Sequence, residues 1–181
     1  MRLTKTAPKG GRLQTPLRIS FDIDDTLVCD SSVPTEQFVS LWARRRYPEK
    51  IRHGARALMR SLAERGCRIW VYTSSRRSPR YVHGWFRHMG IGLEGVVTLC
   101  RHEDVVGCRG PSKYPPAFGI GLHVDDSPGV AMEGEAHRFN VVIVSPGDDG
   151  WASRVLEAVD AMIGRESDSA PYTRARQAVD Y

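Results

Sequence analysis

The chain has 181 residues, of which 41% are hydrophobic and 26% are charged, and this is the size and composition of one soluble globular domain. Collagen-like, mucin-like and wholly disordered chains are excluded, and no apolar run approaches the roughly 18 to 20 residues that cross a bilayer. The formal net charge of +5 favours an anionic partner, and phosphorylated small molecules, proteins and nucleic acids all qualify.

The first eleven residues are basic but contain no apolar stretch of the kind that a secretory signal needs. We therefore expect a cytoplasmic protein, in which thiols stay reduced. The four cysteines form no CxxC pair, so free thiols are expected at Cys29, Cys67, Cys100 and Cys108.

The apolar pattern predicts strands that alternate with helices along most of the chain. Residues 1–16 are predicted to be a flexible lead-in, residues 17–164 to form the domain, and residues 165–181 to be a mobile tail. Strands are predicted at 17–23, 67–72, 96–99, 120–124 and 141–144, and helices at about 35–47, 54–64, 79–89 and 151–163. This order predicts an α/β fold with an open, mostly parallel sheet and helices on both of its faces.

Polar residues follow three predicted strands at the point where each strand ends. They are Asp22 and Asp24, then Thr73 and Ser74, then Asp125 and Asp126. Because the carboxyl ends of parallel strands meet at one edge of a sheet, these side chains should converge there. Converging carboxylates repel unless a hard cation lies between them, and Mg²⁺ prefers oxygen ligands. The sequence therefore predicts a divalent metal site with a neighbouring carboxylate free to exchange protons.

Four segments resemble the motifs of the haloacid dehalogenase-like (HAD) superfamily. Phe21-Asp22-Ile23-Asp24-Asp25-Thr26-Leu27-Val28 is similar to its first motif, DxDx[TV][LV]. Thr73 matches the second motif, Lys113 the third and Asp125-Asp126 the fourth, and the resemblance covers about residues 19–144. It implies a Rossmann-like core and a Mg²⁺-dependent phosphatase that acts through an aspartyl-phosphate.

The resemblance also implies a role for each acid. Asp22 would attack phosphorus, and Asp24 would protonate the leaving oxygen and then activate water. Mg²⁺ would be held by the Asp22 side chain, the Asp24 carbonyl and Asp126, with Asp125 bound directly or one shell further out.

Phosphate contacts are implied for residues on the second and third motifs. Thr73 and Lys113 would bind the phosphoryl oxygens, and Lys113 would also restrain Asp22. Ser74, next to Thr73, is a further candidate contact. Arg76, Arg77, Arg80 and Arg109 fall in loops that this fold would bring near the site, and guanidinium groups suit phosphate. The alternative interpretation is that each is an ordinary surface arginine.

No long insertion separates the motifs, so the site is expected to be open, as in the superfamily members without a cap domain. Only eleven residues lie between Lys113 and Asp125, and two prolines interrupt the helix expected there.

The short interval and the open site motivate a second hypothesis, a module that binds a phosphorylated partner without turnover. A third directs the same chemistry at a polymer, either a phosphoprotein or a nucleic-acid 3′-phosphate end. The sequence leaves the substrate and the oligomeric state open.

Two further patterns have alternative interpretations. Cys100, His102 and Cys108 resemble three of the four positions of a zinc loop in capless phosphatases, with Val106 at the fourth. Because structural zinc sites are almost always four-coordinate, two free cysteines and a surface histidine are the favoured interpretation. The run of arginines at 44–46 is interpreted as a solvated helix face, since no aromatic platform for nucleic acid accompanies it.

Overall fold

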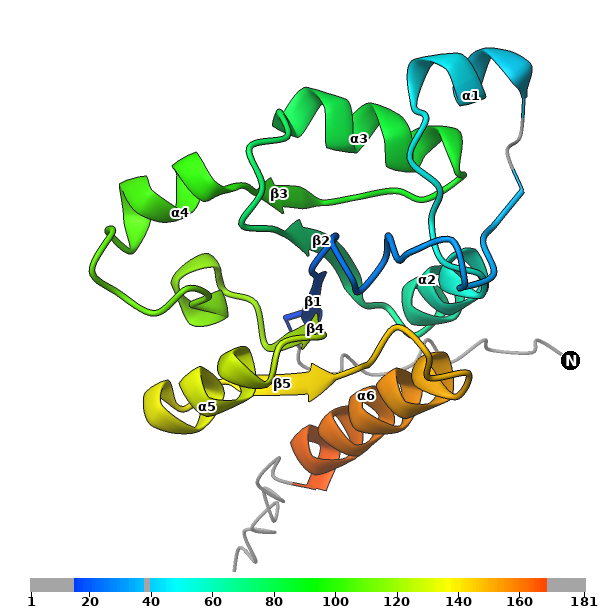
Figure 1. Cartoon of the computed structure of the whole chain (residues 1–181). Helices are drawn as coiled ribbons and strands as arrows, with labels where there is room; N and C mark the ends of the chain where they lie inside the picture. The colour runs from blue at the N-terminus through cyan, green and yellow to red at the C-terminus, as the bar shows by residue number, and fades with distance from the viewer. Residues whose placement is uncertain (1–14, 38–39, 169–181) are drawn as a thin grey trace, which may run out of the picture.

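The computed structural model describes residues 15–37 and 40–168. Its centre is a sheet of five parallel strands in the order β3-β2-β1-β4-β5 (Figure 1). The strands are β1 (Arg18–Phe21), β2 (Arg68–Tyr72), β3 (Gly95–Val97), β4 (Leu122–Asp125) and β5 (Asn140–Ile143). The predicted α/β fold with a parallel sheet is confirmed. The order of the strands reverses beside β1, and ligands bind at such points in open α/β sheets.

Helices cover both faces of the sheet, as predicted. One face carries α2 (Ala55–Glu64), α3 (Pro79–His88) and α6 (Trp151–Asp168), and the other carries α4 (Leu99–Val105), the 3-10 helix η1 (Pro115–Phe118) and α5 (Pro128–His137) (Figure 1). Between β1 and β2 the described residues form two helices, α1 (Leu41–Arg46) and α2, and two isolated bridges, so no cap domain is seen there.

The two faces of the sheet bury different kinds of side chain. On the α2 face, Phe21 and Val71 pack with helix residues such as Leu58 in the larger core. On the opposite face, Trp70 and Tyr72 pack in a smaller core with residues of η1. Because successive strand residues point to opposite faces, the smaller core shares its face with polar residues of β1 and β4.

The helix predicted from residue 35 begins only at Leu41. Thr35 instead pairs with Arg52 in an antiparallel bridge, and the Glu36 N–H donates to the Ile51 carbonyl at 2.8 Å. The hydroxyl of Ser40 accepts a hydrogen bond from the backbone of α1 and caps the short helix. Thr35 and Glu36, at the start of the predicted helix, are therefore not helical, because their backbone is hydrogen-bonded to the segment before α2.

Neither α4 nor α5 was predicted, and the strand predicted at 96–99 ends at Val97. α4 buries only His102, and α5 buries only Val130 and Gly134, so neither helix carries an apolar stripe that a sequence pattern would reveal. Gly134 allows close approach to β5, since a Cβ there would lie 3.0 Å from the Phe139 carbonyl oxygen.

The last helix, α6, continues to Asp168, beyond residue 164, where the domain was predicted to end. The remainder of the predicted tail and most of the predicted lead-in lie outside the described residues. None of the described helices is both long and apolar enough to cross a membrane.

Candidate active site

Three strands deliver polar residues to the carboxyl edge of the sheet. Asp22 directly follows β1, and its N–H donates to the Val124 carbonyl in β4 at 2.9 Å. Thr73 directly follows β2, and its N–H donates to the Val97 carbonyl in β3 at 2.9 Å. Asp125 is the last residue of β4. The hydrogen bonds of the sheet therefore fix the backbone positions of the predicted nucleophile and of its neighbours.

The carboxylate of Asp22 is largely buried and is paired with Lys113. Lys113 Nζ lies 2.6 Å from Asp22 Oδ1 and donates a second hydrogen bond to the Tyr72 carbonyl at 3.0 Å. Burial raises the pKa of Asp22, and the Lys113 ammonium acts against that shift. Among the described residues none donates a hydrogen bond to Asp22 Oδ2. Oδ2 therefore has its lone pairs free for an incoming group, and Oδ1 keeps a second lone pair beside Lys113.

Lys113 reaches Asp22 in spite of the short segment that follows it. Glu133 of α5 accepts hydrogen bonds from the backbone N–H groups of Ser112 at 2.7 Å and Lys113 at 3.1 Å. The two prolines lie in η1, which turns the chain back toward β4. The short interval between Lys113 and Asp125 motivates the hypothesis of a module that binds without turnover. In the structure Lys113 nevertheless contacts the Asp22 carboxylate.

A chain of buried hydrogen bonds lies next to this pair. Ser20 Oγ is 2.8 Å from His123 Nδ1, and His123 Nε2 is 2.9 Å from Asp125 Oδ2. The same oxygen is 3.8 Å from Lys113 Nζ, and Asp125 Oδ1 accepts the Ser127 N–H at 2.9 Å. Burial acts to raise the pKa of Asp125, but the His123 hydrogen bond and the charge of Lys113 lower it overall. We call Ser20, His123 and Asp125 the buried polar chain.

Asp24, the predicted acid/base, lies at the exposed rim of the site. The Arg77 guanidinium donates to both oxygens of Asp24 at 2.7 Å and to Glu49 Oε2 at 2.6 and 2.9 Å. The Tyr81 hydroxyl donates to Glu49 Oε1 at 2.9 Å. The hydrogen bonds to Asp24 and then those to Glu49 raise the pKa of Arg77. The side chain of Asp24 is 54% exposed, against 12% for Asp22. We call Asp24, Arg77, Glu49 and Tyr81 the rim cluster.

The resemblance assigns Mg²⁺ to oxygens of Asp22, Asp126 and the Asp24 backbone. Asp126 Oδ1 accepts a hydrogen bond from Thr26 at 3.0 Å, and burial raises the pKa of Asp126. Asp125, in contrast, has a hydrogen-bond donor on each carboxylate oxygen. Two carboxylates and a carbonyl are hard donors that fit Mg²⁺, because this ion keeps several waters beside a few protein ligands.

Within residues 15–37 and 40–168, no three His, Cys, Asp or Glu side chains are assembled to hold a metal ion. The zinc pattern at 100–108 is therefore not gathered into a site. Cys100 and Cys108 are free and exposed. The expectation that His102 lies at the surface is wrong, because its side chain is buried and its Nδ1 is hydrogen-bonded to the Tyr72 hydroxyl.

The predicted phosphate contacts divide into a buried and an exposed group. Thr73 is buried, and its hydroxyl accepts the Ser75 N–H at 3.1 Å. Ser74, Arg76 and Arg109 are exposed, and no described contact joins them to Asp22. The sequence interpretation also gave no role to Ser75, whose buried hydroxyl has no hydrogen-bond partner among the described residues.

Sequence reasoning named Lys113 and Arg77 near the two carboxylates, but it missed several other groups around them. Ser20 lies two positions before Asp22, and His123 two positions before Asp125, so the strand period places both pairs on one face. That signal was present in the sequence. Glu49 offered no such signal, because its contact with α3 depends on how the segment after α1 packs.

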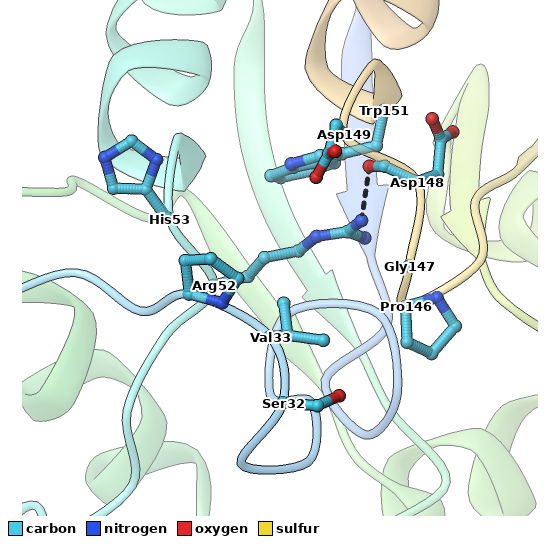
Figure 2. Close-up of a pocket in the computed structure, with 10 residues that line it drawn as sticks. Ser32, Val33, Arg52, His53, Pro146, Gly147, Asp148, Asp149 and Trp151 are labelled. Carbon is cyan, nitrogen blue, oxygen red and sulfur yellow. Dashed lines mark hydrogen bonds between the residues drawn. The ribbon is translucent and has the colours of Figure 1, made fainter.

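A pocket of about 240 Å³ lies between the loops that follow β1 and β5 (Figure 2). Arg52 in its wall is buried, donates to the carbonyls of Ser145 at 3.0 Å and Asp148 at 2.6 Å, and packs over the Trp151 ring. The predicted catalytic residues are not among those that line this pocket. Arg52 therefore joins the two loops, outside the candidate active site.

Comparison with solved structures finds similar chains at low sequence identity. A predicted phosphatase from Clostridium acetobutylicum is 12% identical with a TM-score of 0.49, over 83% of this chain and 100% of that one. The structure of the Pnkp1/Rnl/Hen1 complex contains a chain that is 12% identical with a TM-score of 0.47, over 81% and 53% of the two chains. A predicted HAD-like family hydrolase from Porphyromonas gingivalis is 13% identical with a TM-score of 0.45, over 82% and 98%. No protein-family model and no curated protein matches the chain.

The strand order and the helices of this chain show an α/β, Rossmann-like architecture. Five parallel strands lie in the order β3-β2-β1-β4-β5 with helices on both faces. The four segments that resemble HAD motifs lie at the carboxyl edge of β1, β2 and β4 and on the loop that precedes β4.

Proposed function

We propose that the chain is a Mg²⁺-dependent phosphatase of the HAD type that acts through a phosphorylated Asp22. The observation that carries this proposal is the pairing of a largely buried aspartate with a buried lysine at the end of the central strand. Lys113 orients one carboxylate oxygen at 2.6 Å and leaves the other without a hydrogen-bond donor among the described residues. An aspartate held in this way is suited to nucleophilic attack rather than to a structural ion pair.

In the first step Asp22 Oδ2 forms a bond to phosphorus while the bond from phosphorus to the ester oxygen breaks. Asp24 gives its proton to the leaving oxygen, which departs as an alcohol. In the second step Asp24 takes a proton from water, and the water oxygen attacks phosphorus. The bond between phosphorus and Asp22 breaks, inorganic phosphate leaves and the carboxylate of Asp22 is restored. Asp24 is then protonated again and ready for the next cycle.

Lys113 and Thr73 bind the phosphoryl oxygens in this proposal. The Lys113 ammonium is a fixed positive charge in a buried site, where it stabilises developing negative charge more strongly than in water. Asp22, Asp126 and the Asp24 carbonyl would hold Mg²⁺. The bound ion would offset the repulsion between Asp22 and the phosphate and polarise the phosphoryl group.

The direct test is hydrolysis of p-nitrophenyl phosphate with Mg²⁺, with EDTA, and by the Asp22→Asn protein. We expect Mg²⁺-dependent turnover that EDTA abolishes and that the substitution lowers by roughly four orders of magnitude. Asp30→Asn, which changes an exposed aspartate in the loop after β1, is the matched control and should keep full activity. Full activity of Asp22→Asn would refute the proposal.

The rim cluster favours a second candidate function. Both oxygens of Asp24 are engaged by Arg77, so a chain that never released this aspartate would bind a phosphorylated partner without turning it over. The same assay separates the two functions. Saturable binding of a phosphomonoester with no release of phosphate over hours would favour the binding module.

A further inference from the structure

Positive charge is concentrated in one part of this chain. Residues 41–88, from α1 through α3, contain 13 Lys and Arg residues and only 2 Glu, with no Asp. Because the whole chain has a net charge of only +5, the remaining residues are net negative. Where such charges gather on the surface, they attract an anionic partner from a distance.

Part of this charge lines a groove of about 600 Å³ along α3. Its basic side chains are Arg46, Arg80, His83 and Arg87, all exposed, and its residues include no Asp or Glu. We call these four residues the basic groove. The ten residues of α3 span about 15 Å, which is longer than a single phosphate and suits a partner with several.

An exposed aromatic residue lies beside the basic groove. Trp42 on α1 is 60% exposed, whereas the other three tryptophans of the chain are at most 7% exposed. Its ring centroid is 5.0 Å from that of His88, at the end of α3, and α1 lies beside that end of α3 in Figure 1. Trp42 lines a second hollow, of about 530 Å³, with Leu41, Arg44 and Arg45. We call these four residues the Trp42 patch. It supplies the aromatic side chain that the interpretation of residues 44–46 as a solvated face had found missing.

The basic groove begins next to the candidate active site. Arg77 of the rim cluster contacts Glu49, and Glu49 is hydrogen-bonded to Tyr81 of α3. The ring of Tyr81 lies 5.2 Å from that of Tyr47, which lines the groove. The residues that line the groove are thus joined to Asp24 through Tyr81, Glu49 and Arg77.

We propose that the basic groove and the Trp42 patch bind a single strand of nucleic acid whose terminal phosphate is the group that Asp22 attacks. Binding of single strands combines a positive groove for the backbone with an exposed aromatic side chain on which a base stacks. Both features are present and adjacent, whereas a small phosphorylated metabolite would use neither. The assignment of the terminal phosphate rests on the proposed phosphatase function, and the binding surface does not.

Binding is measured with the full chain and a fluorescein-labelled single strand of oligothymidylate that carries no terminal phosphate, by anisotropy over a range of salt concentrations. We expect the affinity to fall steeply as salt rises, because each phosphate that is neutralised contributes about 0.7 to the logarithmic slope for a single strand. A base stacked on Trp42 should also quench tryptophan fluorescence. The change can be assigned to Trp42 because the other three tryptophans are buried.

Two variants separate the contributions of charge and stacking. Arg46→Ala combined with Arg87→Ala should lower the salt slope by about 1.4, because two phosphate contacts are lost. Trp42→Ala should weaken binding by about 5- to 150-fold and abolish the quenching. The matched control combines Arg60→Ala with Arg68→Ala, which removes two exposed arginines outside the groove and should leave the slope unchanged. All of these proteins should hydrolyse p-nitrophenyl phosphate like the parent.

Turnover is then compared on 3′-phosphorylated and 5′-phosphorylated oligonucleotides and on a phosphopeptide. Release of phosphate from an oligonucleotide, lowered in both groove and Trp42 variants, supports the proposal. Hydrolysis of p-nitrophenyl phosphate without oligonucleotide binding overturns it and leaves the proposed function standing. A preference for the phosphopeptide overturns it as well. Oligonucleotide binding without any phosphatase activity overturns the proposed function and the assignment of the terminal phosphate, while the binding surface stands.

Discussion

The two carboxylates of the first motif lie in opposite environments, Asp22 beside the buried polar chain and Asp24 in the rim cluster. Asp22 is held by a buried lysine next to the buried polar chain, whereas Asp24 is exposed and held by Arg77. A buried charge that loses its partner remains desolvated, while an exposed pair exchanges its partner for water or a ligand at little cost. The proposed nucleophile is therefore fixed before a substrate arrives, and the proposed acid/base has to be released.

The largest expected effect comes from Lys113→Met, which leaves Asp22 and Asp125 buried without this counter-charge. The free energy of unfolding at pH 7 should fall by about 3–5 kcal/mol, and turnover should fall at least about 100-fold. The folded-state pKa of Asp22, raised by burial, should rise further. Stability is then retained at low pH, where Asp22 is protonated, and lost as pH rises through the raised pKa.

Urea unfolding at pH 5 and pH 7 measures this difference between Lys113→Met and the parent. Lys50→Met, at an exposed lysine, is the control and should unfold like the parent at both pH values. Equal stability of Lys113→Met at the two pH values would contradict the account of Asp22 as a buried carboxylate that needs a counter-charge.

Ser20→Ala is expected to have a smaller effect on the same region. It removes the partner of His123 Nδ1, and an unsatisfied buried nitrogen costs about 1–3 kcal/mol. Because His123 orients Asp125, kcat should fall a few-fold with KM unchanged. Ser20→Thr, which keeps the hydroxyl, should restore kcat at least in part. A variant with parental stability and kcat would show that the buried polar chain does not support the site.

Arg77→Ala tests the other side of the comparison and should have the smallest effect. The Arg77 side chain is 21% exposed and that of Asp24 is 54% exposed, so the free energy of unfolding should change by less than about 1 kcal/mol. Arg65→Ala, which removes the surface ion pair with Asp160, provides a baseline in thermal unfolding. A loss as large as that of Lys113→Met would mean that the rim is as fixed as the interior.

The sequence predicted the elements whose apolar residues follow a clear period. The strands around Asp22 and Thr73 and the apolar stripe of α2 were predicted because each segment buries one regular face. α5 was missed because it packs through a close approach at Gly134 instead of through a stripe. The position of a side chain at a strand end follows from local sequence, so the meeting of Asp22 with Asp125 was predictable.

The partners of the two carboxylates were less predictable. The contact between Lys113 and Asp22 was implied only by the family resemblance, since the loop before β4 has no periodic pattern that would fix its path. The hold of Arg77 on Asp24 depends on the packing of Glu49 and Tyr81 between distant segments. Local patterns therefore place the acids, and long-range packing decides what each acid is bonded to.

The most direct test of the central claim is to trap the phosphorylated aspartate in the Asp24→Asn protein. With p-nitrophenyl phosphate the first step needs little protonation of the leaving oxygen, while the second step lacks its base and should slow by about 10²- to 10⁴-fold. We predict that mass spectrometry after acid quenching finds one phosphoryl group on the peptide that contains Asp22. Turnover in this variant with no adduct, or with an adduct on another residue, would contradict the assignment of Asp22 as the nucleophile.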